Sequence, residues 1–360
     1  MPINKRKILL RGLKATGGLR LLESTSAWSG LLVLNYHRIG TVGDSLFDRA
    51  LWSASQETFD RQVRLLARSC EVVGLDELPD VVRGLESGRR SLASQDRFAM
   101  ITFDDGYLDN FEQAFPVLKS NGVSGVFFVT TGFVDETPLA WWDEISWMVR
   151  SSRCESIRCE SIRCESIDAS VWSGGRVVID RPDCDVAIRS LLQHYYGLDA
   201  SRTVEFLDFL AEATGAGRAP RSLSDGLWMN WDQVRQMRAE GMSFGAHTVT
   251  HPVLARLSPE QQSFEICESK LRLERELGEP ITALSYPVGR RDAFDQRTQT
   301  ALSHHGIEWA FSYYGGFLTR DLARRRQVDR LDIPRVAVES DTSSADFRSY
   351  VALPQVFSRH

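Results

Sequence analysis

Short apolar runs alternate with helix-like segments from residue 31 almost to the end of the chain. The apolar runs are too short for buried helices and predict strands at 31–37, 71–75, 97–103, 123–130, 242–246, 281–287, 307–313 and 331–338. Apolar residues at helical spacing predict helices at 59–70, 76–88, 110–122, 231–241, 258–278 and 294–306. Strands that alternate with helices in this way build a parallel sheet covered by helices. The pattern therefore predicts an α/β fold, and the number of strands favours a distorted or incomplete (β/α) barrel.

Residues 131–228 interrupt this alternation of strands and helices. They are expected to form an insertion on the rim of a barrel that spans 31–340, with a C-terminal tail over 341–360. Within the insertion, the five residues RCESI occur three times in succession at 153–167. Five residues advance a helix by about 140° beyond a full turn, so the repeated cysteines would not share a face. A duplicated surface loop explains such perfect copies, and a three-cysteine metal site is the alternative.

The composition narrows the class of protein. The 360 residues are 42% hydrophobic and 25% charged, which is typical of soluble globular proteins and excludes a disordered chain. The net charge is −5, but the first 22 residues carry six basic and no acidic side chains, so the rest of the chain is acidic. An acidic body argues against a wide nucleic-acid interface. The six cysteines show no disulfide framework, which favours a reducing compartment, and no apolar run approaches the roughly 18 residues of a membrane span.

The basic segment over residues 1–30 admits three interpretations. Its lysines and arginines interrupt what would be the apolar core of a secretory signal, and no small-residue cleavage site follows. A basic amphipathic helix packed on the domain is the plainest interpretation. The third is a helix that lies on an anionic membrane surface through residues 1–22, with its basic side chains outward. The chain is accordingly expected to be cytoplasmic, with peripheral contact to the inner face of the membrane as an open alternative.

Two adjacent carboxylates, Asp104 and Asp105, follow directly on the predicted strand 97–103. Neighbouring carboxylates repel each other, so this position needs a cation or several hydrogen-bond donors. An ordinary helix cap is the alternative role for either residue. The carboxyl ends of strands are where catalytic groups gather in α/β barrels, which favours a functional site.

His247 and His251 follow the predicted strand 242–246 and are four residues apart. This spacing places two imidazoles on one side of a helical turn, as a chelating pair requires. Imidazole suits zinc and other divalent transition metals, and one carboxylate would complete a three-ligand site with room for water. Two unrelated surface histidines are the alternative, but the chain has only seven histidines in all.

Two further strand ends carry candidate groups. His37 closes the strand 31–37 and lies on the same edge as the other candidates if the sheet is parallel. The turn after strand 281–287, bounded by Pro287 and Gly289, is able to direct a backbone N–H toward a developing negative charge. Taken alone, each of these is an ordinary structural feature.

Three motifs occur in a characteristic order, TFDDG at 102–106, HTVTHP at 247–252 and YPVG at 286–289. Together they resemble the polysaccharide deacetylase family, carbohydrate esterase family 4, over roughly residues 31–130 and 228–340. The resemblance implies a distorted (β/α) barrel. It also implies a metal-dependent removal of acetyl groups from N-acetylated sugars.

By this resemblance, Asp104 corresponds to the catalytic base. Three residues correspond to the metal ligands: Asp105, His247 and His251. The chain also departs from the family, because Ser285 stands where an arginine is usual and Val288 where an aromatic residue is usual. Either Arg335 or Arg38 is the candidate substitute for that arginine.

The strand predicted at 331–338 lacks the histidine that the family usually places there as general acid. The opening LLVLNYHR at 31–38 resembles a branch in which an N-terminal strand supplies this group, which implies His37 as the acid. The backbone N–H of Val288 is the expected oxyanion donor. Five side chains are expected to contact the substrate: Tyr36, Tyr286, Trp141, Trp142 and Arg335. Hydrophobic anchoring of the insertion is an equal alternative for the two tryptophans.

The expected reaction is hydrolysis of an acetamide on an amino sugar, in polysaccharide or glycolipid biosynthesis. A divalent ion, Zn²⁺ first with Ni²⁺, Co²⁺, Fe²⁺ and Mn²⁺ as alternatives, would polarise the amide and activate water. Asp104 would act as base and His37 as acid. Two rival hypotheses stay open: an O-acetyl esterase on the same metal site, and a saccharide-binding relative that has lost turnover. The expected partner is an N-acetylated saccharide and not a nucleic acid.

Overall fold

The computed structural model describes residues 28–87, 96–152, 164–168, 172, 176–180, 184–325 and 327–357, together with 12, 16 and 18. Most of the predicted basic segment 1–30 and residues 153–163 of the RCESI repeat lie outside this part of the chain. The membrane-surface interpretation of residues 1–22 and the three-cysteine site therefore lie outside the described residues. Among the described helices, none is long and apolar enough to cross a membrane.

One nine-stranded sheet forms the centre of the molecule. Its strands are β1 (Gly30–Tyr36), β4 (Glu71–Val72), β5 (Arg97–Phe103), β6 (Val126–Val129), β9 (Ser243–Ala246), β10 (Ala283–Ser285), β11 (Trp309–Phe311), β12 (Leu318–Thr319) and β13 (Val336–Ala337). Their order is β11-β10-β9-β6-β5-β1-β12, with β4 beside β5 and β13 beside β1. All neighbours pair in parallel except β1 and β12. A separate parallel pair is formed by β2 (Arg38–Ile39) and β3 (Trp52–Ala54).

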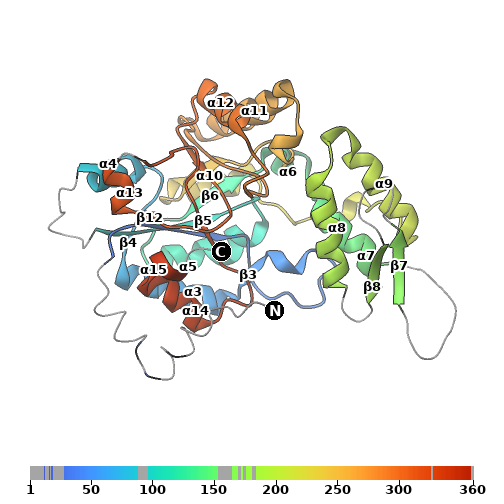
Figure 1. The fold of residues 1–360 in the computed structure, drawn as a ribbon, viewed down its shortest axis with the longest axis horizontal. Helices are drawn as coiled ribbons and strands as arrows, with labels where there is room; N and C mark the ends of the chain where they lie inside the picture. Colours follow the sequence, from blue (N-terminus) through green and yellow to red (C-terminus); the bar gives the residue numbers. More distant parts are fainter. Residues whose placement is uncertain are drawn as a thin grey trace.

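The sheet curls because its two sides are joined. Ile333 forms an isolated parallel bridge with Phe311 of β11, and shortly afterwards the same segment pairs with β1 as β13. The chain from Ile333 to Ala337 therefore links β11 to β1. This confirms the prediction of a distorted (β/α) barrel, in which the carboxyl ends of the parallel strands share one edge (Figure 1).

Helices pack around this sheet. They are α3 (Gln56–Ser69), α4 (Leu78–Ser87), α5 (Phe115–Ser120), α6 (Thr131–Glu136), α10 (Trp231–Ala239), α11 (Pro259–Leu277), α12 (Gln296–His304) and α13 (Arg320–Arg324). The sequence explains α11 well, because Ser258 and Gln261 form a reciprocal capping box and Gly278 ends the helix in a left-handed conformation. The helix predicted at 110–122 is divided into a π-helical turn at Asn110–Ala114 and α5.

The insertion predicted at 131–228 has a hydrophobic cluster of its own. Its main elements are α7 (Trp141–Arg150), α8 (Asp185–Gly197), α9 (Thr203–Thr214) and the antiparallel strands β7 (Cys164–Asp168) and β8 (Arg176–Asp180). Side chains from the three helices meet in this cluster, among them Ile145, Leu191 and Phe206. Figure 1 shows these green elements on one side of the barrel. The architecture is thus the expected barrel with an insertion on its rim.

The end of the chain differs from the tail predicted over 341–360. Two helices occupy it: α14 (Ser344–Ala352) and α15 (Pro354–Phe357). Helix α14 packs against α3 and buries Phe347 in the core beneath the sheet. The indole N–H of Trp28 donates to the carbonyl of Val351 over 2.8 Å. The segments before β1 and after β13 therefore complete the core together.

Candidate active site

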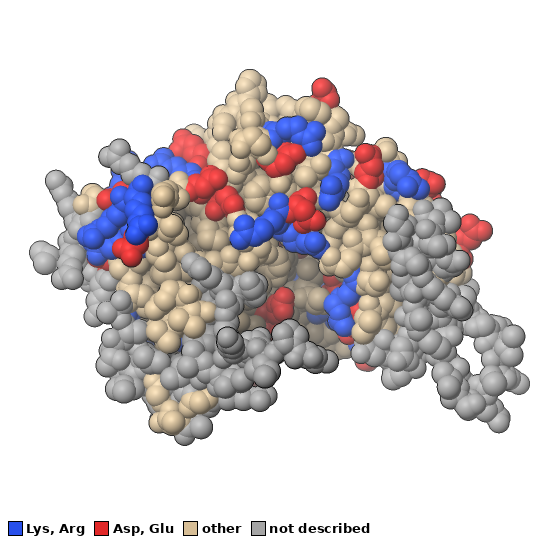
Figure 2. Space-filling model, viewed as in Figure 1, with Lys and Arg blue, Asp and Glu red and all other residues tan. Residues whose placement is uncertain are grey.

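The loops that follow β1, β5, β9 and β10 meet at the carboxyl edge of the sheet. They bring six predicted residues to the wall of one cavity: His37, Asp104, Asp105, His247, His251 and Val288. The cavity has a volume of about 310 Å³, and α7 and α8 of the insertion supply part of its wall through Trp141, Trp142 and Tyr196. Figure 2 shows the molecule hollowed between the barrel and the insertion.

Asp105, His247 and His251 form a buried triad. Oδ1 of Asp105 lies 3.4 Å from Nε2 of His247 and 3.5 Å from Nε2 of His251, and the three ligand atoms all lie within 4.8 Å of one another. These separations are long for hydrogen bonds. They match the spacing of about 3.4 Å between two atoms that each lie about 2.05 Å from a tetrahedral ion. Two imidazoles and one carboxylate at this spacing fit a zinc-type ion.

The two imidazoles of the triad differ in how their other ring nitrogen is held. Nδ1 of His247 lies 2.8 Å from the carbonyl oxygen of Ser285, which makes it the donor and leaves the Nε2 lone pair for a metal. Nδ1 of His251 is buried, and no described residue hydrogen-bonds to it. Burial, helped by the charge of His247, lowers the pKa of His251 to about 3. Burial acts in the same direction on His247, but the charges of Asp104 and Asp105 outweigh it and raise the pKa of His247.

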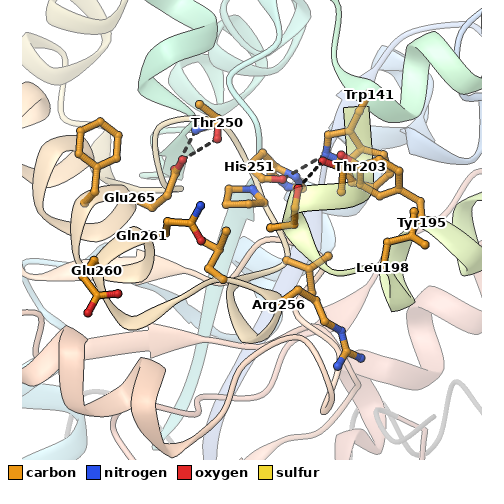
Figure 3. Close-up of a pocket in the computed structure, with 15 residues that line it drawn as sticks. Trp141, Tyr195, Leu198, Thr203, Thr250, His251, Arg256, Glu260, Gln261 and Glu265 are labelled. Atoms are coloured by element: carbon orange, nitrogen blue, oxygen red, sulfur yellow. Dashed lines mark hydrogen bonds between the residues drawn. The ribbon is translucent and has the colours of Figure 1, made fainter. Parts of the chain in front are cut away.

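The loop that carries these histidines is hydrogen-bonded to α11. Its main chain is left-handed at two residues that are not glycine, Thr248 with φ +65° and His251 with φ +57°. The carboxylate of Glu265 accepts from the backbone N–H of Val249 over 2.7 Å. It also accepts from the backbone N–H of Thr250 over 2.9 Å (Figure 3). These bonds stabilise the strained conformation that turns both imidazoles toward the carboxylate of the triad.

Asp104 lies beside the triad but is bound by other groups. Arg335 donates from Nη1 to Oδ1 over 2.8 Å and from Nη2 to Oδ2 over 2.7 Å. The amide of Asn35 donates to Oδ2 over 2.8 Å, and the hydroxyl of Ser285 over 3.2 Å. All four side chains are buried. Each oxygen of the Asp104 carboxylate thus accepts from at least one of these side chains, and Asp104 does not belong to the triad.

This environment keeps Asp104 ionised. Burial alone would raise the pKa of the carboxyl, but the guanidinium of Arg335 and the imidazole of His247 outweigh burial and hold the pKa well below its usual range. A carboxylate that is ionised and lies on the wall of the cavity is able to accept a proton from a water molecule there.

The position of Arg335 corrects the expectation that it contacts the substrate. Its side chain is completely buried, and its Nε also donates to the carbonyl of Ser312 over 3.1 Å. Of the two arginines that were candidates to stand beside the base, Arg335 pairs with Asp104, whereas Arg38 pairs with Asp109 over 2.8 Å. Arg335 is therefore a positioning residue for the neighbouring carboxylate.

His37 lines the cavity from the end of β1. Its main chain is fixed on both sides, because its N–H donates to Oγ of Ser53 over 3.0 Å and its carbonyl accepts from the amide of Asn110 over 2.7 Å. Its ring packs edge-on against Tyr313 with 5.7 Å between centroids. A partly exposed imidazole in a fixed place is suited to donate a proton to a group bound in the cavity.

Val288 lies in a tight turn with a left-handed backbone, at φ +63°. The N–H of Gly289 donates to the carbonyl of Pro287 over 2.6 Å and closes the turn. The N–H of Val288 itself has no acceptor among the described residues. The predicted turn is therefore present at the cavity wall, with one N–H available for a ligand.

Neither of the two tyrosines expected to bind substrate presents its hydroxyl to the cavity. Tyr36 is fully buried on the opposite face of β1 from Asn35, because side chains alternate along a strand, and its hydroxyl donates to Gln62 over 3.0 Å. The structure thus excludes Tyr36 as a substrate contact. Tyr286 borders the cavity, but its hydroxyl donates to the carbonyl of Leu331 over 2.6 Å.

Trp141 and Trp142 line the cavity from the first turn of α7, and both are largely buried. Trp141 stacks on Tyr195 of α8, with 4.0 Å between centroids and 11° between planes. Its indole N–H donates to the carbonyl of His251 over 3.1 Å. Trp141 also borders a second cavity of about 470 Å³ between α8 and α11 (Figure 3). These contacts anchor the insertion on the barrel, and both tryptophans also line the first cavity.

Three contributors to the site were not predicted from the sequence: Asn35, Glu265 and Tyr313. The asparagine directly precedes the predicted cluster at the end of β1, and its place at a strand end is a signal that identifies it. Tyr313 likewise closes the predicted strand 307–313, but nothing comparable marks Glu265. Glu265 is one of many charged residues on α11, and Tyr313 reaches the cavity only because β11 lies beside β10.

The chain is similar in sequence to known proteins. The family model described as Polysaccharide deacetylase matches residues 92–156 and 202–310. YxkH of Bacillus subtilis (strain 168), whose name assigns it to the polysaccharide deacetylases, is 30% identical over 120 residues, or 33% of this chain. That match spans 40% of the relative's own length.

Solved structures share the fold. The Streptococcus pyogenes deacetylase PplD, in complex with acetate, has a TM-score of 0.55 and 16% identity, and the match covers 92% of this chain and 99% of that one. IcaB from Ammonifex degensii has a TM-score of 0.52 and 20% identity, with 91% and 97% covered. At these identities the likeness is one of fold. The residues matched by the family model include Asp104 and the whole triad, and the chain belongs to the polysaccharide deacetylase family.

Proposed function

We propose that this chain removes the acetyl group from an N-acetylated amino sugar within a saccharide, with a divalent metal ion held by the triad. A deacetylase hydrolase is the activity that the family supports. The observation that carries the metal-dependent hydrolysis is the arrangement of two adjacent carboxylates. Asp105 faces the two imidazoles, while Asp104 stays ionised outside the triad beside Arg335.

The reaction follows from the placement of the groups around the cavity. When bound by the triad, the ion polarises the acetamide carbonyl and makes water more acidic. Asp104 accepts the proton of the attacking water, because its ionised carboxylate lies on the same cavity wall as the triad. The N–H of Val288 donates to the carbonyl oxygen as negative charge develops there. His37 protonates the sugar nitrogen as the C–N bond breaks, which yields acetate and a free amine.

Zinc is the ion that the donor set suits best, since two imidazoles and a carboxylate at tetrahedral spacing are its usual ligands. Nickel, cobalt, iron and manganese use the same donors, and metal analysis of the purified protein distinguishes them. The composition of residues 1–22 and the scattered cysteines support a cytoplasmic reaction in saccharide biosynthesis, on an oligosaccharide or a lipid-linked precursor.

Acetate release tests the proposed reaction. Protein loaded with Zn²⁺ is expected to release acetate from oligomers of N-acetylglucosamine, and a chelator is expected to stop the release until Zn²⁺ is returned. O-acetylated sugars form the comparison arm. Acetate from O-acetylated sugars alone would identify an esterase. No acetate from either substrate, with metal bound, would identify a saccharide-binding relative, and both results would contradict the proposal.

A further inference from the structure

One histidine of the triad lacks the support that metal-binding histidines ordinarily have. A ligating imidazole usually donates its second ring N–H to a carbonyl or a carboxylate, which fixes the orientation of the ring. His247 does so through Ser285, whereas Nδ1 of His251 has no hydrogen-bond partner among the described residues. His251 also has a strained main chain, at φ +57°. Its ring must therefore be held toward Asp105 by packing.

Two tryptophans at the start of α7 supply that packing. The indole N–H of Trp141 donates to the carbonyl of His251 over 3.1 Å and fixes its main chain (Figure 3). The ring of Trp142 packs edge-on against the imidazole, with 4.4 Å between centroids and 63° between planes. Trp142 is the closest ring to His251 in the described part of the chain, ahead of His247 at 4.7 Å and Trp141 at 6.2 Å. Rotation of the imidazole is thus limited mainly by Trp142.

Trp142 is itself held by a buried chain of polar groups. Its indole N–H donates to the hydroxyl of Tyr107 over 2.8 Å, and this hydroxyl donates to Oδ2 of Asp143 over 2.9 Å. Oδ1 of Asp143 accepts from the backbone N–H of Asp48 over 2.9 Å. An indole only donates, so the tyrosine hydroxyl accepts from Trp142 and keeps its own proton for Asp143. The three side chains are buried, so water does not compete for these bonds.

We propose that the chain Asp143–Tyr107–Trp142 is the outer support of His251 and sets the affinity of the triad for its metal. Its members are positioning residues, because they act on the metal site only through the ring of His251. The inference rests on the proposed metal site. It gives the insertion a part in the reaction, since Trp142 and Asp143 belong to α7. Loss of such an outer support weakens metal binding by about 10- to 100-fold.

Titration of the full-length protein with Co²⁺ tests this role, because the visible absorption of Co²⁺ reports both binding and ligand geometry. Tyr107→Phe removes the hydroxyl that links Trp142 to Asp143. Trp142→Phe keeps a ring beside His251 but removes the N–H. Both variants are expected to bind Co²⁺ roughly 10-fold more weakly and with an altered spectrum. Trp172→Phe is the matched control, a substitution of the same kind in the insertion, where Trp172 packs on α9 outside the cavity wall.

Three outcomes decide the matter. Unchanged Co²⁺ affinity and spectrum in Tyr107→Phe would overturn the inference, and so would an equal loss in Trp172→Phe, because the effect would then be general loosening of the insertion. Thermal unfolding of the metal-free proteins shows whether each variant is folded. If Trp142→Phe does not fold, the result for Tyr107→Phe decides the test, because that variant lacks only one oxygen atom. If the unmodified protein binds no Co²⁺, the proposed function fails instead.

Discussion

At the residue scale, the site depends on two adjacent aspartates that have different partners. Asp105 faces two histidines, whereas Asp104 is paired with Arg335 and bonded to Asn35. The sequence marks both aspartates by their place at a strand end. It leaves the arginine open between Arg335 and Arg38, because Arg335 lies 231 residues from Asp104 along the chain and only the closure of the sheet brings the two together.

Arg335→Met is expected to lower the free energy of unfolding by about 3–5 kcal/mol at neutral pH, because it leaves a buried carboxylate without a counterion. The depressed pKa of Asp104 contributes stability that is present above the unfolded-state pKa and is lost as pH falls toward the folded-state value. The difference between the variant and the unmodified protein is therefore expected to shrink below about pH 4. Urea unfolding at neutral and acidic pH measures both effects.

Arg61→Met is the control for this prediction. Arg61 pairs with Glu57 on the exposed face of α3, where an ion pair contributes little to stability. We expect this variant to unfold almost as the unmodified protein does at either pH. A loss in Arg335→Met that is the same at neutral and acidic pH would show that Asp104 does not depend on Arg335 for its charge.

At the element scale, boundaries could be predicted where periodicity and caps agree. β5 spans the predicted residues 97–103, and α11 is bounded by Ser258 and Gly278 as its caps indicate. The apolar runs at 281–287 and 307–313 are longer than the strands β10 and β11. An apolar run indicates which residues are buried, but not which of them hydrogen-bond to an adjacent strand. Periodicity shows which residues form strands, but not which strands pair.

The helix α14 was missed because it falls in a short polar stretch at the end of the chain. Its start carries a signal, since Ser343 and Asp346 form a capping box. The signal alone does not show that the helix packs on the barrel. That depends on Phe347, which enters the core between elements far away in the sequence.

Phe347→Ala tests whether α14 is part of the barrel. The side chain is 1% exposed, so its truncation is expected to lower the free energy of unfolding by about 3–5 kcal/mol. Phe264→Ala is the matched control, because Phe264 of α11 is 56% exposed and its loss removes little packing. Urea unfolding of the two variants measures the difference. Similar small losses in both would mean that the end of the chain is detached, as a tail would be.

At the scale of the whole molecule, the barrel carries the reacting groups and the insertion completes their surroundings. The fold class and the groups that follow strand ends could be predicted, because a parallel sheet brings all its carboxyl ends to one edge. The prediction that Tyr36 contacts the substrate was wrong, because the face to which a side chain points at the end of a strand is set by the register of pairing. The support of His251 by Trp142 could not be predicted either, because it depends on how the insertion packs against the barrel.

The proposed reaction requires that Asp105 binds the metal and that Asp104 does not. Metal analysis of Asp104→Asn and Asp105→Asn, together with acetate release, tests this claim most directly. We expect Asp104→Asn to retain as much Zn²⁺ as the unmodified protein while releasing no acetate, and Asp105→Asn to lose both metal and activity. Loss of Zn²⁺ from Asp104→Asn, or its full retention in Asp105→Asn, would contradict the account.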